Sequence, residues 1–225
     1  VAPNGLNRYG HDATRQELID FCNGLAHRVK VDPAGFTDEE RVEFGAHLLA
    51  EAESGWDFNP RFKGRCMDYN PVDLNAILYG FERNMASFVD LLGLPGKEVW
   101  DKRADTRRTL MNKYMLDPDS GLYYDFDFVC GKRSDVYSSA VFTVFWLGVA
   151  DRNRTQALVD NLGLLEADYG VLTCAPRPGV TSFAQWDTPN GWAPVHFFAI
   201  KGLDRYGYRE DAARIAGKYL EAQTS

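Results

Sequence analysis

Two loop segments of this 225-residue chain, each also rich in glycine or amide residues, place a carboxylate directly beside a tryptophan. The first reads Glu-Ser-Gly-Trp-Asp-Phe over residues 53–58, so Asp57 lies between the indole of Trp56 and a phenylalanine. Aromatic neighbours withdraw a carboxyl group from water, and burial favours its protonated form. Asp57 is therefore a candidate general acid, with the indole as a flat apolar face next to it. The residues alone leave an alternative open, in which Asp57 caps a turn and Trp56 fills the core.

The second segment, residues 184–194, reads Ala-Gln-Trp-Asp-Thr-Pro-Asn-Gly-Trp-Ala-Pro. Indoles, amides and a carboxylate in one turn suit carbohydrate recognition, because indoles pack on the C–H face of a sugar ring and planar polar groups bind its hydroxyls. The candidate binding residues are Gln185, Trp186, Asp187, Asn190 and Trp192. In the interpretation without a ligand, Asp187 and Asn190 organise the loop and cap a helix, while Trp192 packs in the core.

Helical periodicity dominates the rest of the chain. Apolar residues recur at spacings of three and four, and this pattern predicts helices over residues 13–30, 37–53, 72–92, 97–116, 136–150, 152–165, 192–206 and 208–222. A helix that is apolar all round is expected inside, and one with a polar face outside. From residue 72 onward inner and outer helices alternate, which predicts repeated helical hairpins.

The connections between these hairpins differ in length. Those from an outer to an inner helix are long and cover residues 54–71, 117–135 and 166–191. Long loops in a compact domain tend to be functional. Because the helices alternate in direction, we expect all three connectors at the same end, where one concave site could draw on them. The predicted fold is all-α, an α/α toroid of hairpins, with an open α-solenoid as the second choice; only residues 171–175 suggest a local strand.

The motifs are similar to those of the trehalase family of glycoside hydrolases. The resemblance is carried by residues 53–58 followed by Pro-Val-Asp-Leu-Asn-Ala at 71–76, by the loop at 117–127, and by Gln-Trp-Asp-Thr-Pro-Asn-Gly-Trp-Ala-Pro at 185–194. It implies a six-hairpin toroid that hydrolyses an α-glucosidic bond with inversion of the anomeric centre. The substrate that it favours is α,α-trehalose. Related toroid families that hydrolyse mannosylglycerate, glucosylglycerate or other α-glucosides share the first motif and remain the alternative.

Individual roles follow from this resemblance. It makes Asp57 the general acid that protonates the glycosidic oxygen, and it places Gly55 and Trp56 beside the acid in the substrate site. The side chains expected to shape the sugar pocket are Gln185, Trp186 and Asp187, with Asn190 and Trp192 behind them. Asp73 and Asn75 are expected to anchor the start of a helix.

The N-terminal segment resembles the family less closely. The family's Arg- and Gly-rich signature is absent, and its Arg-Pro-Glu-Ser segment has only a loose counterpart without the Glu. Arg8, in the string Gly-Leu-Asn-Arg-Tyr, is the candidate hydroxyl-binding residue there. The same string is closer to the mannosylglycerate-type relatives.

An inverting hydrolase also needs a base, whose carboxyl group lies roughly 6.5 to 9.5 Å from that of the acid. The resemblance places this base in a Gly-rich loop after the next outer helix, whereas the chain stops at Ser225 with about four of six hairpins. We therefore expect association with the remainder of the toroid or with another chain, and exposed apolar surface on helices 72–92 and 136–150. The alternatives are a base replaced by Asp125, Asp127 or Asp187, a sugar-binding module without turnover, and a solenoid scaffold for protein partners.

Composition limits the classes of binding partner. The formal net charge is −7 and the sequence contains no run of Lys or Arg, which argues against nucleic acids and anionic membranes as partners. The longest apolar run, residues 141–150, is half of what a membrane span needs. Four dispersed cysteines never approach a zinc-ligand spacing, so neither a metal nor a cofactor is expected. We predict one domain over residues 1–225 that binds a small carbohydrate. We also predict that the protein is located in the cytoplasm.

Overall fold

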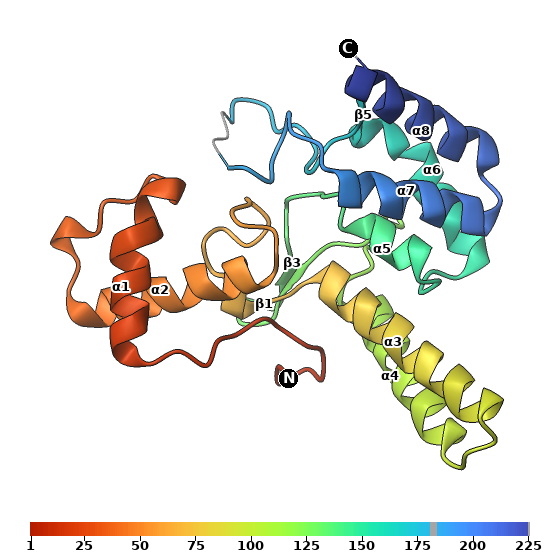
Figure 1. The fold of residues 1–225 in the computed structure, drawn as a ribbon, viewed down its shortest axis with the longest axis horizontal. Coiled ribbons are helices and arrows are strands. Elements are labelled where there is room, and N and C mark those ends of the chain that lie inside the picture. Colours follow the sequence, from red (N-terminus) through yellow and green to blue (C-terminus); the bar gives the residue numbers. More distant parts are fainter. Residues whose placement is uncertain (181–183, 225) are drawn as a thin grey trace.

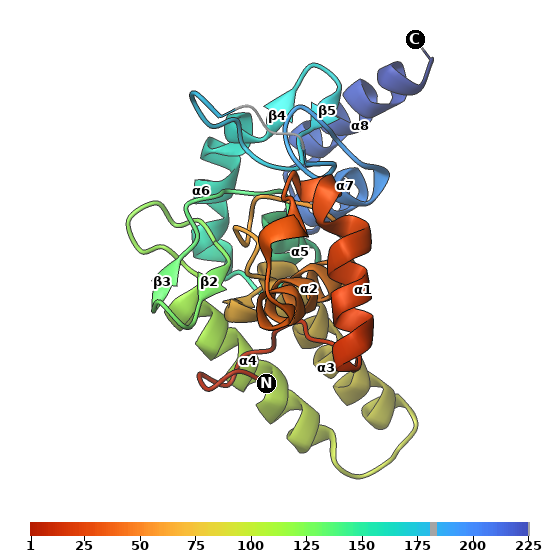
Figure 2. The ribbon, with the colours of Figure 1, turned by 90° about the vertical axis from the view of Figure 1, so that its left-hand side faces the viewer.

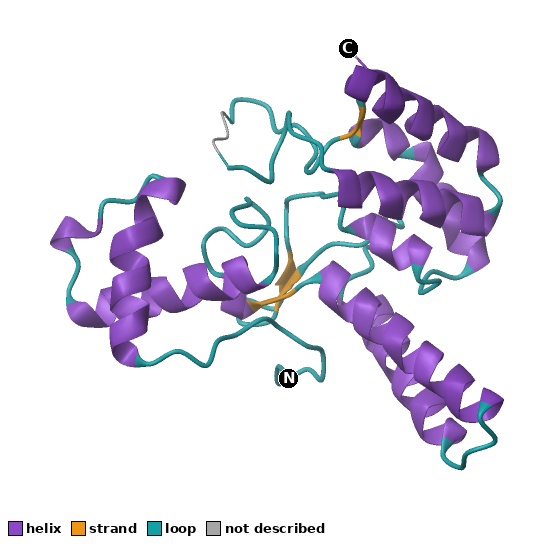
Figure 3. Cartoon of the chain, in the orientation of Figure 1, coloured by secondary structure: helices purple, strands orange, loops and turns teal. Residues whose placement is uncertain are grey.

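The computed structural model describes residues 1–180 and 184–224 as helical hairpins grouped around a centre of loops (Figure 1). The α-helices are α1 Arg15–Leu25, α2 Asp38–Glu53, α3 Val72–Leu91, α4 Lys97–Tyr114, α5 Val141–Trp146, α6 Thr155–Asp160, α7 Ala193–Tyr206 and α8 Arg209–Thr224. Single turns of 3₁₀-helix lie at η1 Ala26–Val29, η2 Pro33–Gly35, η3 Cys66–Asp68, η4 Arg152–Arg154 and η5 Leu162–Leu164. The predicted all-α class is confirmed, as Figure 3 shows.

Capping boxes fix where the first two helices begin. The Thr37 hydroxyl accepts from the backbone N–H of Glu40, and the Glu40 carboxylate accepts from the backbone N–H of Thr37. Thr14 and Glu17 form the same pair at the start of α1. Each box satisfies backbone donors that the first helical turn leaves open. Helix α2 ends at Glu53 and leads directly into the turn that carries Asp57.

The helices pack as hairpins. Helix α1 packs on α2, α3 on α4 and α7 on α8, while α5 contacts both α3 and α7. The α3–α4 hairpin extends away from the loop centre (Figures 1 and 2). Helices α5 and α7 approach closely because Gly202 has no side chain; a Cβ there would lie 2.8 Å from the Cβ of Phe145. This contact lies in the main core, to which α5 contributes fully buried rings.

Three predicted helices are shorter than the sequence indicates. The helix expected over 13–30 is α-helical only over 15–25 and is followed by η1. The helix expected over 136–150 is formed only over 141–146, and the one expected over 152–165 is split into η4, α6 and η5. Residues 136–140 are buried but form a loop, in which the Ser139 backbone N–H donates to the Thr173 carbonyl at 2.9 Å. A continuous run of apolar residues indicates burial but does not show whether the segment is a helix or a loop. The sequence pattern therefore predicted a longer helix than the structure contains.

The expected exposure of apolar helix surface is confirmed for only one of the two helices. On α3, Ile77, Phe81 and Phe88 are 43%, 54% and 54% exposed. The prediction for 136–150 is wrong, because Val141 to Phe145 are buried between α3 and α7. None of the helices in the described part of the chain is long and apolar enough to cross a membrane.

Short strands hold the long connectors together. Strands β1 Tyr69–Asn70, β2 Phe126–Asp127 and β3 Lys132–Arg133 form an antiparallel sheet in that order, which ties the first connector to the second. Strands β4 Glu166–Ala167 and β5 Gly170–Val171 form a local pair, which contains only Val171 of the strand expected over residues 171–175. An isolated bridge between Ser138 and Cys174 links the third connector to the end of the second. The connectors therefore meet, as predicted, apart from residues 181–183, which lie outside the described part.

Candidate active site

The turn that carries Asp57 begins where α2 ends. Gly55 has a φ of +75°, a left-handed conformation that favours glycine. The Asp57 side chain is 33% exposed, and its Oδ2 lies 3.4 Å from Nη1 of Arg28. The carboxyl group is thus accessible from solvent and has a cation beside it.

Arg28 joins the two sequence motifs. Its Nη1 faces Asp57, and its Nη2 donates to Oε1 of Gln185 at 2.8 Å. The backbone confirms the connection, because the N–H of Trp186 donates to the carbonyl of Phe58 at 3.0 Å. Residue 57 and residues 185–187 therefore lie close together, although 128 positions separate Asp57 from Gln185. Arg28 itself lies in η1, outside both motifs, and no pattern in its sequence neighbourhood indicates this contact.

Three indoles form a continuous cluster at this site. The ring centroids of Trp56 and Trp186 are 4.9 Å apart, and Trp186 stacks on Trp192 at 4.7 Å with an interplanar angle of 16°. Trp56 is only 6% exposed, so of its two interpretations the structure favours packing in the core. Trp186 and Trp192 are half-buried, which leaves them as the indoles that a sugar ring could contact.

Asp187 and Asn190 organise the loop around these indoles. Asp187 is fully buried; its Oδ2 accepts from Arg177 at 2.5 Å and its Oδ1 from the backbone N–H of Thr188. The Asn190 amide donates to the carbonyl oxygen of Gln185 at 3.1 Å, and the Trp192 indole N–H donates to the same oxygen at 3.2 Å. Asp187 is therefore a buried support of this loop, whereas the Gln185 side chain is exposed.

The N-terminal segment is anchored by Asn75, one of the two residues predicted to anchor the start of a helix. Asn75 accepts from the backbone N–H of Asn7 at 2.9 Å and donates to its carbonyl at 3.0 Å. Arg8 follows, and its Nη1 donates to the adjacent carbonyl of Tyr9 at 3.1 Å. No contact of Arg8 with the three indoles is recorded among residues 1–180 and 184–224, and its hydroxyl-binding role stays a prediction.

A buried arginine, Arg61, lies behind Trp56, and no sequence motif indicates its contacts. Arg61 is fully buried; its guanidinium donates to both oxygens of Asp125 at 2.9 and 2.7 Å and to Asp73 at 2.6 Å. Its Cζ lies 4.6 Å from the ring centroid of Trp56. Arg61 thus joins the Asp57 turn to the start of α3 and to the second connector, so Asp73 acts as an anchor through this arginine.

Comparison with known proteins decides the family. The family model described as Trehalase matches residues 6–225. The chain belongs to the trehalase family. It is 32% identical over 213 residues to a probable trehalase of Eremothecium gossypii, covering 88% of this chain and 29% of the relative. It is 33% identical over 197 residues to a cytosolic neutral trehalase of Kluyveromyces lactis, covering 80% and 26%. The chain spans less than a third of the length of these curated relatives.

Solved structures confirm the toroid class for this trehalase-family chain. It is similar to the neutral trehalase Nth1 from Saccharomyces cerevisiae, with a TM-score of 0.80 and 28% identity over 97% of this chain and 46% of that one. A mannosylglycerate hydrolase from Thermus thermophilus follows with a TM-score of 0.64 and 22% identity, covering 82% and 44%. At that lower identity the similarity concerns the fold alone.

The acids considered as replacement bases are all engaged elsewhere. Asp125 is 2% exposed and paired with Arg61, Asp127 is 1% exposed and paired with Arg65, and Asp187 is paired with Arg177. A carboxylate in a buried ion pair is poorly placed to activate a water molecule at Asp57. Among the described residues, no group of three or more His, Cys, Asp and Glu side chains could hold a metal ion.

His196 supports the tryptophan loop of this trehalase-family chain from behind. Its Nε2 accepts from the backbone N–H of Val171 at 2.8 Å, and its Nδ1 lies 2.8 Å from the carbonyl of Trp192. A ring that accepts a hydrogen bond at one nitrogen is neutral and carries its proton on the other, so Nδ1–H donates to the Trp192 carbonyl. Burial lowers the pKa of His196 below its ordinary value of 6.5.

We expect the unfolding free energy to depend on His196 in acid. A depressed pKa in the folded state means that unfolded chains bind the proton first, so stability present above about pH 6.5 is lost as the pH falls further. His196→Gln, which cannot take up this proton, should lose less stability between about pH 7 and pH 5 than the wild type. Urea unfolding at both pH values measures this, with His27→Gln, on the exposed His27, as control. Equal slopes for wild type and His196→Gln would contradict the prediction.

Proposed function

We propose that this chain carries the proton-donating part of a trehalose-hydrolysing site, in which Asp57 protonates the glycosidic oxygen. The observation that carries the proposal is the position of Arg28, which contacts both the Asp57 carboxyl and the Gln185 amide beside the stacked indoles. Relatives named as trehalases indicate trehalose as the substrate. Since one of these relatives is a cytosolic enzyme, we also propose a cytosolic location and a small carbohydrate as the ligand.

In this proposal each group has a separate task. The half-buried faces of Trp186 and Trp192 pack on the apolar face of a glucose ring, and the exposed Gln185 amide binds a hydroxyl. Asp57 gives its proton to the bridging oxygen as the C–O bond breaks, and Arg28 at 3.4 Å then faces the new carboxylate. Water forms a new C–O bond at the anomeric carbon from the face opposite the leaving group and gives a proton to a base on that face. The configuration of the anomeric carbon is thereby inverted.

Hydrolysis of trehalose by the full protein tests the proposal. Both anomeric carbons of α,α-trehalose are α, so inversion at one of them releases one β- and one α-glucose. Proton NMR of the first-formed sugar therefore reports the stereochemistry directly. Equal amounts of the two anomers at the earliest times support an inverting α-glucosidase, whereas α-glucose alone excludes inversion. Absence of glucose release from trehalose overturns the proposed activity.

A sugar-binding role without turnover is the second candidate. It is favoured by the burial and pairing of Asp125, Asp127 and Asp187, which leaves the base unassigned among the residues that the structure describes. Calorimetry with trehalose, maltose and glucosylglycerate distinguishes the two functions. Binding of any of these without release of glucose supports the second candidate, and release excludes it.

The indole stack gives a prediction for affinity. We expect Trp186→Ala to weaken trehalose binding about tenfold, which is ~1.4 kcal/mol, because the change removes the ring between Trp56 and Trp192. Trp186→Phe should recover part of this loss, since it keeps an aromatic face. Calorimetry with trehalose measures the effect. Trp146→Phe is the control, because the half-buried Trp146 stacks on Phe198 of α7 instead. An unchanged Kd for Trp186→Ala would exclude Trp186 from the sugar site.

A further inference from the structure

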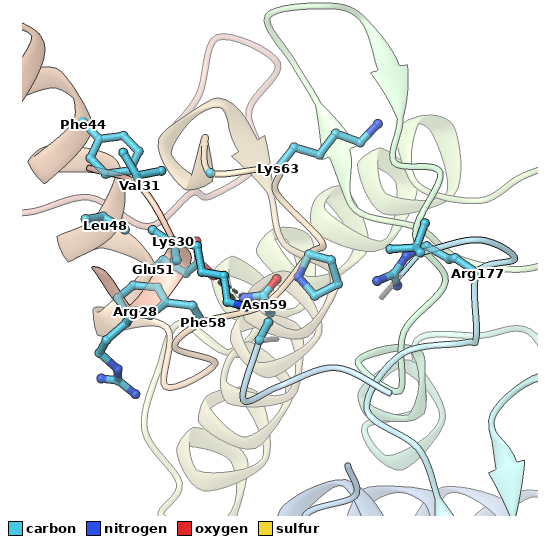
Figure 4. A pocket seen from close by; sticks show the side chains of 15 residues that line it. Arg28, Lys30, Val31, Phe44, Leu48, Glu51, Phe58, Asn59, Lys63 and Arg177 are labelled. Atoms are coloured by element: carbon cyan, nitrogen blue, oxygen red, sulfur yellow. Dashed lines mark hydrogen bonds between the residues drawn. The ribbon is translucent and has the colours of Figure 1, made fainter. Parts of the chain in front are cut away.

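A buried glutamate lies directly beneath the Asp57 turn. Glu51 is in the last turn of α2, two residues before its end, and is only 2% exposed. It lines a cavity of about 420 Å³ between α2, η1 and the turn, together with Phe58 and Asn59. Figure 4 shows Glu51 and Asn59 side by side in the middle of this cavity, joined by hydrogen bonds. The sequence motif begins only after Glu51, and the proposed reaction does not use it.

One oxygen of Glu51 holds the turn through Asn59. Glu51 Oε1 accepts from the backbone N–H of Asn59 at 2.7 Å and from its side-chain amide at 2.9 Å. The same amide donates to the carbonyl of Trp56 at 2.7 Å, and its oxygen accepts from the backbone N–H of Arg61 at 2.8 Å. Backbone groups on both sides of Asp57 are therefore fixed by a single glutamate and a single asparagine.

The charges around Glu51 do not neutralise it. Among the described residues none of the cations lies within ion-pair distance of its carboxyl. The charged and titratable groups that act on it are Arg61 and Asp57 from the turn and Cys66 from the first connector. The cavity beside it is also lined by four cations, Arg28 of η1, Lys30 directly after η1, Lys63 and Arg177. Burial is the largest influence and raises the pKa of Glu51 to about 8. Asp57 acts in the same direction, whereas the hydrogen bond from the Asn59 backbone and the charge of Arg61 act against it and are outweighed.

We propose that Glu51 is a positioning residue for Asp57, which holds the turn as an uncharged carboxylic acid and releases it when it ionises. The proposal rests on the role proposed above for Asp57. An ionised Glu51 would be a buried anion without a paired cation and next to a second carboxylate, and such a group gains by moving toward water. That movement would remove the acceptor from Asn59 and free the backbone on both sides of Asp57.

The pH range of this effect follows from its sign. Because the pKa of Glu51 is raised in the folded state, its contribution to stability is complete below the ordinary value of 4.5 and is lost as the pH rises toward about 8. Glu51→Gln cannot ionise and keeps a carbonyl oxygen for both Asn59 donors, so it should hold the turn at every pH. Glu51→Ala removes the acceptor and leaves two buried donors unsatisfied.

The test has two independent measurements on the full protein. Near-UV circular dichroism follows the cluster of Trp56, Trp186 and Trp192, and steady-state kinetics with trehalose separate kcat from KM. In the wild type we expect both the indole signal and kcat to change with a midpoint near pH 8, and KM to stay nearly constant. Glu51→Gln should show neither change. Glu82→Gln is the control, because Glu82 is a buried glutamate of α3 paired with Arg107, away from the turn, and it should behave as the wild type.

The outcomes separate this proposal from the proposed function. An alkaline change in the indole signal that persists in Glu51→Gln overturns the proposal, as does a wild-type signal without any change. Glu51→Ala should lower kcat about tenfold or more at neutral pH, since small displacements of a reacting group are costly, and an unchanged kcat also overturns it. If no variant and no wild type releases glucose, the proposed activity fails, while the circular dichroism still decides the role of Glu51.

Discussion

Replacing Asp57 with asparagine is expected to lower kcat for trehalose by roughly 10²- to 10⁴-fold, the usual contribution of a general acid. Asparagine has nearly the same shape and can still accept from Arg28, which lies 3.4 Å from the carboxylate. It has no proton of suitable acidity to give to the glycosidic oxygen. The loss should therefore appear in kcat, with KM and the unfolding free energy close to those of the wild type.

A substrate with a better leaving group separates acid catalysis from other effects of Asp57→Asn. Fluoride leaves α-glucosyl fluoride with much less need for a proton than a sugar alkoxide does, so the variant should retain most of its activity on that substrate. Asp204→Asn, on an exposed aspartate of α7, is the matched control and should be neutral on both substrates. An equal loss on trehalose and on the fluoride would contradict the role of Asp57 as acid.

The arrangement of connectors could be predicted because it follows from helix direction alone. Alternating helices place long loops at one end, and the contacts of Trp186 with Phe58 and of Arg61 with Asp125 show that these loops meet. The end of the helix expected over 136–150 could not be predicted, since a buried loop and a buried helix share one apolar pattern. The three-stranded sheet was missed because its strands have only two residues each.

The site was predictable where its residues lie within one motif. Asp57, Gln185 and Trp186 could be named, whereas Arg28 comes from a separate helix and only the fold brings it near. Glu51 did leave a signal, because it follows Phe44 and Leu48 on the buried side of α2 at spacings of four and three, where an apolar residue is expected. A carboxylate at such a position indicates either a hidden partner or an altered pKa.

Replacing Arg61 with methionine is expected to destabilise the fold by about 3–5 kcal/mol, because it leaves the carboxylates of Asp73 and Asp125 buried without their cation. Urea unfolding at neutral pH measures the loss. Protonation relieves an unpaired buried carboxylate, so the deficit of Arg61→Met relative to the wild type should shrink as the pH falls. Arg61→Lys keeps the charge but cannot donate to both oxygens of Asp125 in the same geometry. Its unfolding free energy should therefore lie between those of the wild type and Arg61→Met.

The solvent exposure of the paired side chains determines how much stability is lost when the arginine of an ion pair is replaced. The pair of Arg15 and Glu39 joins side chains that are 54% and 78% exposed, so Arg15→Met should cost less than about 1 kcal/mol. Water replaces the lost partner there, whereas at Arg61 nothing can, since the guanidinium is fully buried beneath Trp56. If Arg61→Met costs no more than Arg15→Met, the two aspartates must reach another cation or water, and Arg61 cannot be what joins the Asp57 turn to α3 and the second connector.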